Sequence, residues 1–197
     1  MIAVRRARPA DAAAIGAVHV AAWRSTYPGI LPDQYLSRLS VPRQAAYYDS
    51  AIRSAVGVHV ATASGADLGP TERQNGTGAR VVGFVTGAPA RVGRGLAPMA
   101  VPLADGEIET LYVLDDWRER GLGRRLMRAA AAHLLAAGCG SAFLWVLRDN
   151  PSRWFYERLG GRTAAEATIM VGGAPVVQTA YVWSPIDKLV QATSSAP

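Results

Sequence analysis

The sequence predicts an α/β fold in which helices flank a mixed β-sheet. Strand-like and helix-like segments follow one another in the order β-α-α-β-β-β-α-β-α-β-β, which differs from the regular βαβ alternation of a doubly wound fold. Half of the 197 residues are apolar and 18% are charged, a balance typical of globular proteins. This length suits one hydrophobic core, so we expect a single domain over residues 1–197.

In the first half of the chain, alternating β-branched segments predict strands and helix-forming segments predict helices. The run from Ser25 to Gly29 is expected to break the first helix, and Gly-rich stretches at 64–79 and 89–105 predict long connections. The expected elements are a strand at 2–8, a helix at 12–23 that starts at Pro9-Ala10-Asp11, a helix at about 32–54, and strands at 56–63 and 80–88.

The second half gives clearer patterns. Gly106 to Leu114 predicts a buried strand, and Gly121 to Ala137 predicts an amphipathic helix that ends at Gly138. The remaining expectations are a strand at 141–147, a short helix with Asn150 at its N-cap and Pro151 at its first position, strands at about 162–171 and 175–183, and a frayed end at 194–197.

Bulk properties exclude several classes of protein. The apolar runs are too short for a transmembrane helix, and the N-terminus lacks the apolar core of a signal peptide. The lone Cys139, which we expect to be buried, rules out an internal disulfide and fits a reducing cytoplasm. The net charge is +6, but the arginines are spread along the chain, which argues against nucleic acid as a partner.

The most informative segment joins the strand at 106–114 to the helix at 121–137. A helix N-terminus after a glycine-containing loop presents backbone N–H groups without intrahelical partners, and the helix dipole adds positive charge there. Such a site suits a pyrophosphate. Gly121 and Gly123 allow close approach, and Arg118, Arg120 and Arg124 can add contacts. The alternative is a tight turn before a helix whose arginines are simply solvated.

Two other phosphate-binding motifs fit this segment poorly. A dinucleotide-binding Rossmann motif would need a third small residue where Leu126 stands, and it would follow the first strand of the domain. A P-loop would need Gly-Lys-Ser/Thr, which is absent here.

Motifs on both sides of this loop resemble those of the GCN5-related N-acetyltransferase (GNAT) superfamily. Arg118-x-x-Gly121-x-Gly123 is similar to the family's Arg/Gln-x-x-Gly-x-Gly/Ala signature, and Leu111 to Leu114 resembles its central splayed strand. The block from Asn150 to Gly161, which contains Phe155-Tyr156-Glu157, resembles a second family motif, and His19 to Pro32 is similar to one bacterial subgroup. The core of the resemblance spans residues 106–161.

The resemblance implies a mostly antiparallel sheet of six to seven strands with a central splay, flanked by about four helices. It also implies an acetyl-CoA-dependent N-acetyltransferase in which an amine attacks the thioester directly within a ternary complex. The main chain of Leu111, Tyr112 and Val113 would lie beside the pantetheine arm. The amides from Arg120 through Leu122 to Arg124, with the Arg118 side chain, would hold the pyrophosphate.

Two further residues carry a role from the resemblance. Asn150 is expected to hydrogen-bond the pantetheine, although it also suits a helix cap, and its spacing to Tyr156 is one residue shorter than the family's usual form. Tyr156 matches the tyrosine near the sulfur, where its hydroxyl can protonate the leaving thiolate. The alternative is that Tyr156 is one more packed aromatic beside Trp154 and Phe155.

Two glutamates are candidates for the base. Glu107 and Glu109 lie two apart on a predicted strand, so their side chains should point to the same face. Glu107 matches a catalytic glutamate of some relatives, while the position used by others is Trp145 here. Either glutamate could take the ammonium proton, or both could merely attract a cationic substrate. No metal is expected, because no histidine has metal-ligand spacing around it.

Trp23 and Tyr27 are candidates for the acceptor wall, because the family often builds that wall from its first helix and the break after it. Glu109 is a further candidate for acceptor binding, because it could attract a cationic substrate. Their alternative role is core packing, and we interpret His19 as a structural histidine. The acceptor is expected to be a small-molecule amine, or alternatively a peptide N-terminus or lysine. A catalytically silent acyl-CoA-binding module is a further alternative, and the resemblance is compatible with a homodimer.

Overall fold

The computed structural model describes residues 1–54, 56–68, 79–90 and 103–194. Its centre is a seven-stranded sheet with the spatial order β1-β2-β3-β4-β5-β7-β6. Neighbouring strands are antiparallel except β4 and β5, which are parallel. The strands are β1 (Ile2–Arg6), β2 (Gly57–Ala63), β3 (Arg80–Pro89), β4 (Gly106–Val113), β5 (Ala142–Leu147), β6 (Arg162–Val171) and β7 (Ala174–Trp183).

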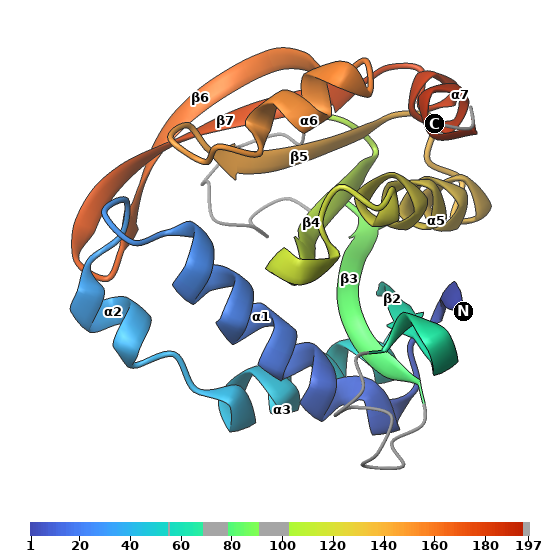
Figure 1. Ribbon diagram of the computed structural model, residues 1–197. Coiled ribbons are helices and arrows are strands. Elements are labelled where there is room, and N and C mark those ends of the chain that lie inside the picture. The colour runs from blue at the N-terminus through green and yellow to red at the C-terminus, as the bar shows by residue number, and fades with distance from the viewer. Residues whose placement is uncertain (55, 69–78, 91–102, 195–197) are drawn as a thin grey trace.

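Helices cover both faces of this sheet (Figure 1). On one face, Ile15 and Val18 of α1 and Tyr48 of α3 pack against β2 and β3. On the other, α5 shares a core with residues of α6 and α7. The α-helices of the described residues are α1 (Ala12–Thr26), α2 (Asp33–Ser37), α3 (Val41–Arg53), α5 (Leu122–Ala136), α6 (Arg153–Arg158) and α7 (Asp187–Ser194).

The predicted sheet is confirmed, but the helices need correction. The described residues form six α-helices rather than about four. The single helix expected at 32–54 is two helices, because Ser40 caps a new start: its hydroxyl accepts from the Arg43 N–H at 3.4 Å. The predicted break at Ser25 comes too early, since α1 continues through Thr26. Helix α7 was not predicted at all.

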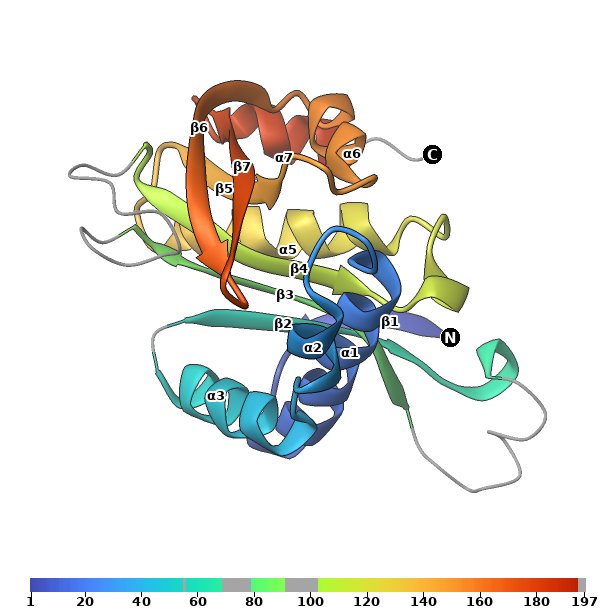
Figure 2. The ribbon, with the colours of Figure 1, turned by 90° about the vertical axis from the view of Figure 1, so that its left-hand side faces the viewer.

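The sheet is splayed at its centre. Strands β4 and β5 pair only at Gly106 with Ala142 and Glu107 with Phe143, and beyond these positions no pairing joins them. The two strands therefore diverge, as Figures 1 and 2 show. The facing edges of β4 and β5 leave main-chain groups without a sheet partner, and such groups require another partner when they are buried.

The outer part of the β6–β7 hairpin extends beyond the end of β5 and reaches the helices on the other side of the splay (Figure 2). Its turn consists of Gly172 and Gly173, both with positive φ. Ile169 and Val171 near this turn pack with Tyr27, Leu31 and Leu36 in a small separate core. The hairpin thus connects the C-terminal half of the sheet to the α1–α2 region. No helix of the described residues is long and apolar enough to cross a bilayer.

Candidate active site

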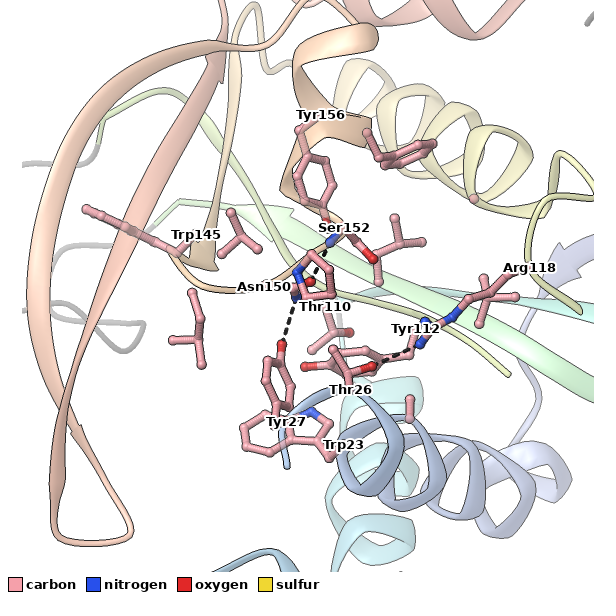
Figure 3. Close-up of a pocket in the computed structure, with 18 of the residues that line it drawn as sticks. Trp23, Thr26, Tyr27, Thr110, Tyr112, Arg118, Trp145, Asn150, Ser152 and Tyr156 are labelled. Atoms are coloured by element: carbon pink, nitrogen blue, oxygen red, sulfur yellow. Dashed lines mark hydrogen bonds between the residues drawn. The ribbon is translucent and has the colours of Figure 1, made fainter. Parts of the chain in front are cut away.

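A cavity of about 770 Å³ lies where β4 and β5 diverge. Its walls come from the C-terminal end of α1, the outer half of β4, the loop that leads into α5, and the ends of β5, α6, β6 and β7. Figure 3 shows side chains from these elements pointing toward one another across this space. The cavity therefore brings segments from both ends of the chain into one site.

The start of α5 forms one corner of this cavity. Gly121 is the N-cap residue and has φ 73, a conformation that favours glycine, and Glu119 before it also has a positive φ of 59. The first α5 amide that donates to a described backbone carbonyl is that of Arg125, which bonds to Gly121 at 3.1 Å. The helical amides before Arg125 have no intrahelical carbonyl to bind, and amides in this position at a helix N-terminus suit an anion.

The two glycines of the signature have different surroundings. A Cβ at Gly121 would meet no atom within 4 Å, so space for a phosphate remains above it. A Cβ at Gly123 would lie 3.1 Å from the Phe155 ring of α6. Gly123 therefore allows α6 to pack closely on α5, in addition to exposing backbone to the cavity.

The arginines of this loop have separate partners. The Arg118 guanidinium donates to Thr26 Oγ1 at 2.9 Å and pairs with Asp115 at 2.8 Å, so it connects the loop to the end of α1 (Figure 3). Arg120 stacks on the Trp117 ring at 4.7 Å and is not part of the cavity wall, whereas Arg118 and Arg124 are. Of the three predicted arginine contacts, the Arg120 side chain is the one placed away from the cavity.

The backbone of β4 borders the cavity, while its side chains pack in two hydrophobic cores. Leu111 and Val113 pack against the α5 core, while Tyr112 packs on the opposite face near Phe84 and His19. All three residues line the cavity. The strand edge beside the splay can thus offer main-chain groups to an extended ligand, while its side chains hold the sheet in place.

The two candidate glutamates are not equivalent. A β-bulge interrupts the pairing of β3 with β4: Thr86 stands opposite Thr110 and Gly87 opposite Ile108, which leaves Glu109 as the extra residue. The strict alternation that predicted one shared face therefore does not hold here. Glu109 lines the cavity and is partly exposed, while Glu107 is 9% exposed and is not among the lining residues.

Tyr156 lies on α6 and extends into the cavity (Figure 3). Burial, and to a lesser degree the neighbouring Tyr27, raises the pKa of its hydroxyl above the ordinary value. The hydroxyl is therefore protonated at neutral pH and can act as a hydrogen-bond donor or proton donor.

Asn150 is placed differently from its predicted role as a helix cap. Helix α6 begins at Arg153 with Ser152 as its N-cap residue, so the predicted cap at Asn150 and first position at Pro151 are wrong. The reason is a turn: Asn150 Oδ1 accepts from the Ser152 N–H at 2.8 Å. Its Nδ2 donates to the Tyr27 hydroxyl at 3.1 Å, across the cavity from α6 (Figure 3).

His19 and Trp23 of α1, and Tyr27 directly after it, form a row of aromatic rings beside the cavity. The Trp23 ring lies 5.2 Å from His19, nearly parallel, and 5.1 Å from Tyr27, edge to face. His19 Nδ1 is 2.7 Å from the Tyr48 hydroxyl, and burial lowers the His19 pKa to about 4, so this ring is neutral at neutral pH. Trp23 and Tyr27 line the cavity and also pack against each other. The two roles considered for them, cavity wall and core packing, are therefore compatible.

Several lining residues were not among the predicted site residues. They include Thr26, Thr110, Trp145, Ile169, Val171 and Gln178. Gln178 carried a usable signal, because it is a polar residue inside the apolar run Ala174 to Trp183. Ile169 and Val171 gave no such signal, since apolar residues in a strand are ordinary core residues.

A sheet splayed between two parallel central strands, with a helix N-terminus and a protonated tyrosine at the splay, defines a GNAT-type N-acetyltransferase. Residues 81–171 match the family model described as FR47-like protein. An uncharacterized N-acetyltransferase of Bacillus subtilis, YuaI, is 31% identical over 189 residues, which cover 96% of each chain. The chain belongs to the GNAT superfamily of N-acetyltransferases.

Other similarities agree with this assignment. A probable N-acetyltransferase of Mycobacterium tuberculosis is 27% identical over 171 residues, covering 82% of this chain and 83% of that protein. The PaiA N-acetyltransferase of Thermoplasma acidophilum, solved with coenzyme A, superposes with a TM-score of 0.63 at 16% identity, covering 91% and 98% of the two chains. A ribosomal-protein-alanine N-acetyltransferase of Brucella melitensis has a TM-score of 0.65 at 17% identity over 92% and 99%. These two structures establish the shared fold.

Proposed function

We propose that this protein transfers an acetyl group from acetyl-CoA to a primary amine of a small molecule, by direct attack within a ternary complex. The observation that carries the proposal is that one cavity joins the N-terminal end of α5, the edge of β4 beside the splay, the Glu109 carboxylate and the Tyr156 hydroxyl. These are the groups that an acetyl transfer needs, placed along one continuous space.

The residues that would hold acetyl-CoA fit its chemistry. The amides at the start of α5 and the open space above Gly121 suit a pyrophosphate, and Arg124 adds positive charge. The edge of β4 from Leu111 to Val113 suits an extended pantetheine arm, which carries amide groups that can pair with a strand. Bound acetyl-CoA supplies an acetyl group activated as a thioester.

The protein then has three tasks at the thioester. A main-chain N–H at the splayed edge of β4 can polarise the carbonyl, as an oxyanion donor does. Glu109 can accept the ammonium proton of the acceptor through an intervening water, because its side chain lines the cavity. The Tyr156 hydroxyl lines the cavity and can donate its proton toward the departing thiolate, since its raised pKa keeps the hydroxyl protonated at neutral pH. Holding both reactants together supplies much of the acceleration.

Two observations favour this proposal over the alternatives. A silent acyl-CoA-binding module needs neither Glu109 nor Tyr156 in its cavity, and both are there. A protein or peptide acceptor needs an open approach, whereas the β6–β7 hairpin packs against α2 and walls one side of the site: a Cβ at Gly172 would lie 2.6 Å from that of Tyr35. The geometry therefore favours a compact acceptor.

The proposal is tested by acetyl-CoA binding and by turnover. We expect acetyl-CoA to raise the melting temperature, and the release of free thiol to accelerate when an accepted amine from a panel is added. Gly121→Glu should abolish the thermal shift, because it fills the phosphate position with bulk and negative charge.

Gly138→Glu is the matched control for this test. Gly138 also has a positive φ, of 86, and open space at its Cβ, but it follows the other end of α5. The backbone strain is therefore similar while the cavity is untouched, and the thermal shift should persist. Absence of a shift in the unaltered protein would refute acetyl-CoA binding.

A further inference from the structure

Gln178 of β7 is a buried carboxamide on an otherwise apolar sheet face. It stands opposite Leu147 of β5 and Ala167 of β6, and residues opposite each other share a face. Leu147, with Ile169 and Val176 from the same face, packs in the core that contains Tyr27. Gln178 therefore belongs to the side of the sheet that faces α1 and α2, and it lines the cavity.

One polar atom of the Gln178 side chain is buried without a partner in the described part of the chain. The residue is 1% exposed, and its Nε2 atom has no hydrogen-bond partner among the described residues. Buried polar groups are normally paired, and an unpaired one destabilises the fold relative to an apolar side chain of similar shape. The adjacent Thr179, on the opposite face, does have a partner, because its hydroxyl donates to Glu166 at 3.2 Å. An unpaired amide in a cavity wall indicates a ligand that completes it.

The surroundings of Gln178 define the chemistry of that ligand. The cavity residues that β5, β6 and β7 contribute are Trp145, Val146, Leu147, Ile169, Val171 and Gln178, and none is charged. These three strands therefore supply no cation to a carboxylate placed beside them, and its desolvation would cost much. A neutral oxygen can accept from Nε2 without that cost. The aromatic rings of Trp23 and Tyr27 across the cavity suit an apolar body.

We propose that Gln178 determines acceptor specificity by donating a hydrogen bond from Nε2 to a neutral carbonyl oxygen of the acceptor. The preferred acceptors are then primary amines that combine an apolar side chain with a neighbouring amide or ester carbonyl, such as amides of apolar amino acids. This inference rests on the proposed acetyl transfer and adds the acceptor class to it.

Three related amines test the inference: phenylalaninamide, phenethylamine and phenylalanine. The first carries the neutral carbonyl, the second lacks it, and the third replaces it with a carboxylate. We expect kcat/KM for phenylalaninamide to exceed that for each of the other two by at least about tenfold, the effect of one well-placed hydrogen bond. Gln178→Met, which keeps the length of the side chain, should bring the ratio of phenylalaninamide to phenethylamine down by a similar factor while phenethylamine turnover is retained. Because this ratio is compared between two enzymes, the different basicities of the amines cancel.

The melting temperature of Gln178→Met provides a second readout. A role in substrate binding and a purely structural role predict changes of opposite sign in this temperature. Without ligand, Gln178→Met should raise the melting temperature, since it removes an unpaired buried amide. A structural glutamine would instead lower it when replaced. Thr179→Val, one residue along β7 and on the other face, is the matched control and should leave the amine ratio unchanged.

The outcomes separate the two proposals. If the protein acetylates amines but Gln178→Met leaves the phenylalaninamide ratio unchanged, the role of Gln178 is refuted and the acetyltransferase activity stands. If none of the amines, of whatever class, causes acetyl-CoA to be consumed, both proposals fail. If the ratio changes equally in Thr179→Val, the effect belongs to the strand and the role of Gln178 is again refuted.

Discussion

The two sides of the cavity are built in different ways. The side formed by β4 and the start of α5 presents backbone groups: the amides of a helix N-terminus, a strand edge, and a glycine, Gly121, with open space beside it. The opposite side, formed by α1, β5, β6 and β7, presents side chains from elements far apart in the sequence. A backbone site depends on a short contiguous segment, so many sequences with different acceptor walls can share it. The following predictions test this division, beginning with the largest expected effect.

Tyr156→Phe tests the proposed general acid, which lies between the two sides of the cavity. Removal of the hydroxyl should lower kcat about a hundredfold, the scale of a lost general acid, while the thermal shift with acetyl-CoA is retained. Steady-state kinetics and thermal shift measured on the same preparation provide the check. Tyr181→Phe is a suitable control, because Tyr181 neighbours Tyr156 at 5.9 Å between ring centroids but bonds to Glu157 instead. Unchanged kcat in Tyr156→Phe would exclude the acid role.

The two glutamates allow a paired comparison on one strand. Glu109→Gln should lower kcat/KM about tenfold or more at neutral pH, and the loss should shrink as pH rises and the amine deprotonates by itself. Glu107→Gln should have the smaller effect, because Glu107 does not line the cavity. A pH profile of kcat/KM for both variants provides the measurement. A larger loss in Glu107→Gln would reverse the assignment of the base.

The pH dependence of stability compares two buried histidines outside the cavity wall, one behind each face of the sheet. Burial lowers the pKa of His19 beside Trp23 and of His59 near α5, each to about 4. Because both folded-state values lie below the unfolded value of about 6.5, this stability is fully present above that pH and is lost as pH falls toward 4. Each histidine should contribute a slope of about 1.4 kcal/mol per pH unit in this window. Denaturant titrations of His19→Gln between pH 7 and 4.5 should show a shallower slope; an unaltered slope would mean that His19 is not buried neutral.

Asn150→Ala should produce the smallest effect. It removes the hydrogen bond to Tyr27 and the turn bond to Ser152, each worth about 1 kcal/mol. The KM for the amine should rise several-fold if the bridge positions Tyr27, with a smaller change in the KM for acetyl-CoA. Tyr27→Phe removes the same bridge from the other end and should match it. A rise confined to the KM for acetyl-CoA would instead support the predicted contact of Asn150 with the pantetheine.

The same division explains which features were predictable from the sequence. The strand at 106–114, the loop and α5 follow from glycine spacing and helical periodicity, and the mostly antiparallel seven-stranded sheet agrees with the resemblance. The bulge at Glu109 could not be foreseen, because it depends on the pairing of β3 with β4. The contact of Asn150 with Tyr27 joins residues 123 positions apart, which local patterns do not encode. Arg118 was expected to bind phosphate, and its contacts with Thr26 and Asp115 depend on where α1 ends.

The contact between Gly172 and Tyr35 has a consequence for protein engineering. The hairpin turn packs against the Tyr35 ring of α2, next to the small core of Ile169 and Val171, while β4 and α5 take no part in this contact. Tyr35 does not line the cavity itself, so Tyr35→Ala should act by loosening the hairpin wall, which would admit bulkier amines without disturbing acetyl-CoA binding. A saturation library at positions 35, 169 and 171 is small enough to screen completely. It would leave residues 106–136, the proposed acetyl-CoA-binding segment, unaltered. Successive rounds of selection on new amines should therefore accumulate substitutions in α2 and the hairpin.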